Sequence, residues 1–99
     1  MASTQMTNAV RLALRITTQA YDSELESLID AGLGDLGIAG VDNTLTSDPL
    51  LLRAVITYVR CHFGNPPDYD RLKAAYDEQK AQLQTATGYT DWGNADAEE

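Results

Sequence analysis

The chain has very few residues that could cross-link it or bind a metal ion. Its 99 residues include one cysteine, Cys61, and one histidine, His62. A single thiol cannot form an internal disulfide, and one Cys with one His cannot supply the ligands of a structural zinc site. The composition therefore excludes a disulfide scaffold and a zinc finger. We expect no metal site and no cofactor site.

Long apolar segments are also missing, and we expect no signal peptide. No run approaches the roughly 18–20 apolar residues that span a bilayer. The first ten residues, MASTQMTNAV, lack the basic, apolar and cleavage regions of a signal peptide. We therefore expect a cytosolic chain without membrane contact. Apolar residues still make up 43% of the chain, which is enough for the packed core of one domain.

Basic residues are scarce relative to acids. Seven Lys and Arg stand against 15 Asp and Glu, and the net charge is −8. Residues 91–99 carry half of that charge, from Asp91, Asp96, Glu98 and Glu99. An acidic surface repels phosphate backbones, so we do not expect the chain to bind nucleic acid through a basic patch. Solubility is the simplest role of the charge.

Apolar residues recur with helical periodicity along most of the chain. The pattern predicts helices over residues 5–15, from near Ser23, after Asp48 and over residues 69–85. Ser23 to Glu26 matches a capping box, with Asp22 as the rival cap, and Asp48-Pro49 is a cap followed by proline in the first turn. Three glycines either loosen the end of the second helix or admit a close neighbour. They are Gly32, Gly34 and Gly37.

The remaining segments are predicted to be irregular. Residues 37–47 form the longest internal loop, because glycines and Asp42-Asn43 favour turns. Residues 86–99 have no periodicity and are expected to be loose. We therefore divide the chain into a helical domain, residues 1–87, and an acidic, flexible C-terminal tail, residues 88–99.

The third helix is predicted to be the hub of the fold. Its apolar residues point in nearly every direction, which is typical of a helix buried by several neighbours. Its one polar stripe consists of Arg53, Thr57 and Arg60. The fold class expected is all-α: a small bundle of about four helices with a central buried hub helix and an extended C-terminal tail. In the fourth helix we expect a buried stripe containing Tyr76, with Lys80 among the solvated residues.

No arrangement of residues predicts catalysis. Cys61 and His62 are adjacent, and neighbours on a helix point about 100° apart, so they do not form a nucleophile–base pair. Residues 32–37 spell G-x-G-x-x-G, but no strand precedes them, as a phosphate-binding loop requires. We therefore expect a protein that is not an enzyme.

Two features instead predict interaction surfaces. Trp92 is the only tryptophan and lies with Tyr89 in the acidic tail. Both residue types are enriched at interface hot spots, so this segment either folds back on its own core or contacts a partner. The Arg53/Arg60 stripe either pairs with acids of a neighbouring helix or forms ion pairs across a subunit boundary.

The order of these patterns resembles the head-tail connector (adaptor) proteins of long-tailed bacteriophages. The resemblance covers about residues 8–85. The segments that carry it are Leu14 to Ile16, the acid-rich helix Asp22 to Ala31, Asp48 to Val59 with its D-P-L start, the F-G-N-P turn Phe63 to Pro66, and Tyr76-Asp77 with Leu83.

The resemblance implies a structural role in the virion. It implies that residues 1–87 form a connector domain and that copies of the chain form a ring of about twelve subunits beneath the portal protein. The ring would also dock the next neck or tail-completion protein and surround the channel through which DNA leaves without specific binding. The chain would lie in the host cytoplasm during assembly and at the head-tail junction of the virion afterwards.

Two other functions stay open from the residues alone. Four short helices are compatible with a small helical DNA-binding regulator, although no basic recognition helix is visible. An enzyme subunit that takes its chemistry from a partner is neither supported nor excluded.

Overall fold

Four helices make up most of the chain that the computed structural model describes, which is residues 3–44, 48–64 and 66–85. They are α1 (Thr4–Ala13), α2 (Asp22–Ile38), α3 (Pro49–His62) and α4 (Tyr69–Thr85). No strand occurs among these residues, so the prediction of an all-α fold is confirmed. The predictions for the tail, including Tyr89 and Trp92, lie outside the described residues.

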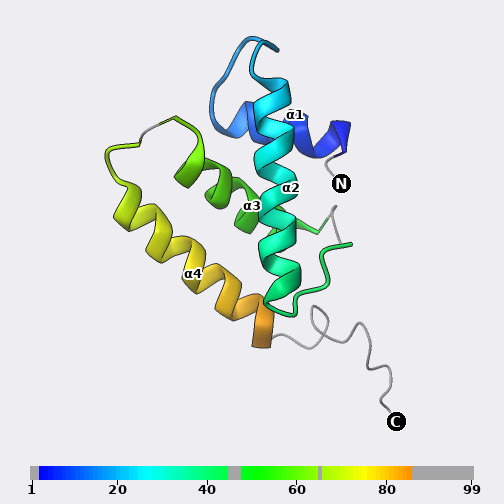
Figure 1. Ribbon diagram of the computed structural model, residues 1–99, viewed down its shortest axis with the longest axis vertical. Coiled ribbons are helices and arrows are strands. Elements are labelled where there is room, and N and C mark those ends of the chain that lie inside the picture. The colour runs from blue at the N-terminus through cyan, green and yellow to red at the C-terminus, as the bar shows by residue number, and fades with distance from the viewer. Residues whose placement is uncertain (1–2, 45–47, 65, 86–99) are drawn as a thin grey trace.

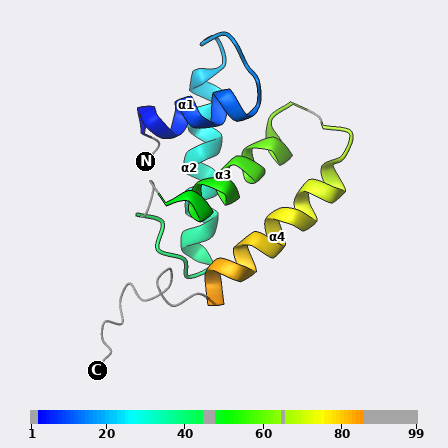
Figure 2. The same cartoon turned by 180° about the vertical axis from the view of Figure 1, so that it is seen from behind.

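The central position predicted for the third helix is confirmed. Helix α3 contacts α1, α2 and α4. Figure 2 shows α4 beside α3 and running in the opposite direction, with α2 crossing behind α3 and α1 crossing α2 near its start. One end of α3 is less buried than expected, since Leu50 is 58% exposed.

The core consists of apolar side chains from all four helices and from one loop residue. Burying such side chains is the main force that holds the helices together, because each removes apolar surface from water. The core residues include Met6, Val10, Leu25, Ile29, Leu33, Leu36, Val41, Leu51, Val55, Val59, Tyr76 and Leu83.

Local capping fixes the start of two helices. Ser3 caps α1 by accepting a hydrogen bond from the Met6 amide at 3.1 Å. Asp48 caps α3 as predicted, accepting from the amides of Leu50 at 2.9 Å and Leu51 at 3.3 Å. These bonds satisfy amides that have no partner within their own helix.

The capping box predicted for α2 is wrong. Asp22 is already helical, Tyr21 is the N-cap, and the described residues supply no side-chain hydrogen bond to this end. The Asp22 carboxylate instead binds the Arg11 guanidinium of α1, with Oδ1 3.0 Å from Nε and Oδ2 2.9 Å from Nη2. This two-point contact joins α1 to α2, and it is stronger than a hydrogen bond between neutral groups because both partners are charged.

The glycine-rich end of α2 stays helical to Ile38, so the loop begins later than predicted. At Gly32, inside this helix, an added Cβ would lie 3.0 Å from Cδ1 of Tyr58 on α3. Gly32 therefore lets α3 approach α2 closely. A Cβ at Gly34 would meet nothing within 4 Å. Of the two interpretations left open for these glycines, the structure favours a close neighbour at Gly32, which is Tyr58.

Candidate interaction surfaces

The polar stripe of α3 lies beside the C-terminal end of α1. Arg60 donates a hydrogen bond from Nη2 to the carbonyl oxygen of Ala13 at 3.0 Å. Ala13 is the last residue of α1, so its carbonyl has no partner within the helix and carries part of the negative end of the helix dipole. This contact holds the Arg60 guanidinium at a defined place on the surface.

Two hollows meet at Arg60. The larger, of about 300 Å³, is lined by Leu14, Phe63, Pro66, Leu72, Asp68 and Arg60. The smaller, of about 130 Å³, is lined by Ala13, Arg53, Ile56, Thr57 and Arg60. We call the two hollows together the Arg60 groove. It combines apolar side chains with both arginines that the sequence singled out.

The Arg60 groove keeps a positive charge in an acidic protein. Among the described residues, no carboxylate forms a salt bridge with Arg53 or Arg60. The one acid that lines the groove, Asp68, is bound by Arg71 at 2.6 Å. Arg60 thus binds a backbone carbonyl of a neighbouring helix, not an acid. The role of Arg53 and Arg60 at a subunit boundary stays a prediction.

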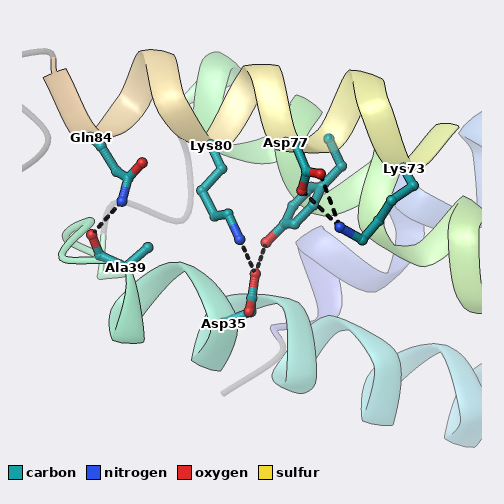
Figure 3. Close-up of polar contacts among 7 residues, drawn as sticks. Asp35, Ala39, Lys73, Asp77, Lys80 and Gln84 are labelled. Carbon is teal, nitrogen blue, oxygen red and sulfur yellow. Dashed lines mark hydrogen bonds and ion pairs between the residues drawn. The ribbon is translucent and has the colours of Figure 1, made fainter. Parts of the chain in front are cut away.

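A second polar cluster joins the C-terminal halves of α2 and α4 (Figure 3). Asp35 of α2 accepts hydrogen bonds from the Tyr76 hydroxyl at 2.6 Å and from Lys80 Nζ at 3.2 Å. One turn further, Gln84 donates to the Ala39 carbonyl at 3.0 Å. These side chains tie together the ends of two helices that meet at one end of the molecule (Figure 1).

Sequence reasoning missed this cluster. Lys80 was expected to be solvated, but its side chain is 25% exposed, because it lies along Tyr76 and reaches Asp35. Tyr76 and Lys80 are four residues apart and therefore share a helix face. That spacing was the available signal, but nothing local pointed to Asp35, which is 41 residues from Tyr76.

The contact shifts the pKa values of Asp35 and Tyr76. Burial acts to raise the pKa of Asp35, but the hydrogen bonds from Tyr76 and Lys80 outweigh it and leave that pKa below its ordinary value. Burial, followed by the bond to Asp35, raises the pKa of Tyr76. The cluster therefore favours an ionised Asp35 and a protonated Tyr76.

We expect Tyr76→Phe to lower the free energy of unfolding by about 1 kcal/mol at pH 7, since a hydrogen bond to a partly exposed carboxylate is lost. The pKa of Asp35 is lower in the folded chain than in the unfolded chain. The stabilisation is therefore complete above the ordinary pKa of 3.8, and it is lost as the pH falls through the pKa of the folded chain. Urea unfolding at several pH values should show the difference between variant and parent shrinking below pH 3.8.

Tyr58→Phe is the matched control for this prediction. Tyr58 is half-buried and packs its ring against Tyr76 with centroids 5.3 Å apart, but no hydrogen bond of its hydroxyl is found among the described residues. Its loss should change stability little and without dependence on acid pH. Equal effects of the two variants would contradict the role assigned to the Asp35 cluster.

The described residues do not bring nucleophile and base together. Cys61 is buried, and burial raises the pKa of its thiol. His62 is exposed, with its ring 4.5 Å from that of Tyr58. The G-x-G-x-x-G residues lie inside α2, not in a loop after a strand. In the part of the chain that the structure covers, no three side chains of His, Cys, Asp or Glu gather as metal ligands, and no helix is long and apolar enough to cross a membrane.

Comparison with known proteins gives a family match. A family model described as "Phage connector protein" matches residues 6–90. The match therefore includes nearly all of α1 and the whole of α2, α3 and α4, with both polar surfaces described above. The searches of curated proteins and of solved structures found no match.

Proposed function

The chain belongs to the phage connector protein family, and from this premise we propose that it is the head-tail connector of a long-tailed phage. Copies of the chain would form a ring beneath the portal, join the DNA-filled head to the tail and surround the DNA exit channel. The observation that carries the proposal is the family match across all four helices. It supports a structural component of the virion, with no chemistry of its own.

Ring formation agrees with where the surfaces lie. A ring closes through heterologous contacts, in which one face of a subunit meets a different face of the next. The Arg60 groove is formed by the end of α1, one side of α3 and the start of α4, whereas the Asp35 cluster joins α2 and α4 toward their C-terminal ends. We propose about twelve subunits, which would match the symmetry of the portal.

The charge agrees with a channel that does not hold DNA. A chain of net charge −8 repels a phosphate backbone over the roughly 8–10 Å at which charges act in physiological salt. Duplex DNA would then pass through the ring without specific binding.

Two protein partners complete the proposal. The portal would bind one side of the ring, and the next neck or tail-completion protein would bind the other. Residues 88–99, with Tyr89 and Trp92 as anchors, would serve as an arm that orders on a neighbour. Assembly would take place in the host cytoplasm.

Negative-stain microscopy with mass measurement, with and without purified portal, tests the proposal. Annular particles are the expected result, because ring closure depends on concentration and on the docking platform. A chain that stays monomeric at high concentration and beside portal would contradict it, as would turnover of a small molecule. Tight binding of duplex DNA in a low-salt filter assay would instead favour a DNA-binding regulator.

A further inference from the structure

We propose that the Arg60 groove binds the C-terminal segment, residues 86–99, of a neighbouring copy of the chain. This inference rests on the proposed ring and names the contact between adjacent subunits. It pairs a positively charged, partly apolar groove with a segment of the same sequence that is acidic and contains aromatic residues.

Complementary charge and apolar character support this occupant. The groove offers Arg53 and Arg60, which no described carboxylate neutralises, beside the apolar side chains of Leu14, Phe63 and Leu72. Residues 86–99 contain two aromatic residues and four acids, with no basic residue. Tryptophan, tyrosine and arginine are the residue types enriched at interface hot spots, and complementary charge adds specificity to such a contact.

The position of the groove favours a neighbour over the same chain. Leu72 lines the groove near the start of α4, and α4 ends at Thr85, 13 residues later. That stretch of helix is about 20 Å long at 1.5 Å per residue. Trp92 follows Thr85 by seven residues, which extend to about 25 Å at most.

The same chain would therefore need a nearly straight segment that runs back along α4 to place Trp92 in its own groove. A neighbouring copy has no such constraint. Because the segment follows the C-terminal end of α4 and the larger hollow lies beside Leu72, near the start of α4, the contact joins unlike ends of two copies, as ring closure requires.

Cross-linking between two differently marked full-length chains tests the proposal. One chain carries Asn94→Cys, within the C-terminal segment but neither aromatic nor charged, and the other carries Thr57→Cys in the groove. After mixing and mild oxidation, we expect a disulfide that joins the two different chains. The native chain is the background control, since its own thiol, Cys61, is buried.

Charge-reversed variants show whether the arginines hold the segment. Arg60→Glu on the Thr57→Cys chain should lower the cross-link yield about tenfold or more, because attraction becomes repulsion. Arg53→Glu should act in the same direction, and it leaves the bond between Arg60 and Ala13 intact. Lys73→Glu is the control for equal charge change; Lys73 is exposed, binds Asp77 and does not line the groove.

Particle mass measured in parallel separates this inference from the proposed ring. Rings without the cross-link between chains would overturn the groove contact and leave the ring standing. A cross-link yield unaffected by both Arg60→Glu and Arg53→Glu would also overturn it. A cross-link without rings would support the groove contact and refute the proposed ring. If neither the cross-link nor rings formed, the groove contact and the ring would both be refuted.

Discussion

Deletion of residues 88–99 is expected to abolish assembly of the chain on portals while leaving its helix content unchanged. Every core residue of the described structure lies between Met6 and Leu83, so the deletion removes no packing contact among them. It does remove Tyr89 and Trp92, and each aromatic hot spot contributes about 2 kcal/mol or more to binding, or roughly thirtyfold in affinity. Circular dichroism measures the helix content, and sedimentation with purified portal measures assembly.

Point variants of the full-length chain distinguish the effect of losing the aromatic side chains from the effect of shortening the chain. Replacing Tyr89 and Trp92 together with alanine should reproduce the loss of assembly. Replacing Thr90 and Asn94 with alanine, in the same segment, should leave assembly near that of the parent. Normal assembly of the deleted chain would refute the role proposed for the C-terminal arm.

The second large effect is expected at Gly32. A leucine there would drive its side chain into the ring of Tyr58, since even a Cβ would lie 3.0 Å from Cδ1. Overpacking costs about 1–3 kcal/mol, and the upper end applies here because leucine adds three carbon atoms beyond the crowded Cβ. The gain in helix propensity over glycine offsets at most about 1 kcal/mol of that cost. We expect Gly32→Leu to lower the free energy of unfolding by about 2 kcal/mol. The melting temperature should fall by about 10 °C, as measured by thermal unfolding.

Gly34→Leu is the matched control, two residues along the same helix. Gly34 is exposed, and a Cβ there meets nothing within 4 Å. The same substitution should therefore stabilise the chain by somewhat less than 1 kcal/mol, through helix propensity alone. If both variants were stabilised equally, the close approach of α2 and α3 would not depend on Gly32.

The sequence alone predicted the helices well wherever the signals were local. The predicted bounds of α4, residues 69–85, match the structure, and Asp48-Pro49 starts α3 as expected. The same reasoning failed at Asp22 and Ser23. The capping pattern is present there, but the helix begins at Asp22, one residue before Ser23, and the Asp22 carboxylate binds Arg11 of another helix.

The candidate surfaces were predicted only in part. The stripe of Arg53 and Arg60 was visible because its residues share a face of one helix. The hollows around this stripe could not be predicted, because they are completed by residues from other elements. These are Ala13 and Leu14 at the end of the first helix and Leu72 of the last helix. The Asp35 cluster escaped notice altogether, because its members look like ordinary surface and core residues when each helix is considered alone.

By itself, therefore, the sequence determined the all-α class, the order of the helices, the central place of α3 and the family resemblance. Periodicity and capping act over a few neighbouring residues and can be detected without the fold. Only the tertiary structure decided that Gly32 admits Tyr58, that Asp35 binds Tyr76, and that Arg60 reaches the end of α1. The two hydrogen bonds join residues 41 and 47 positions apart, and such pairs are chosen by how the helices pack, not by the residues beside them.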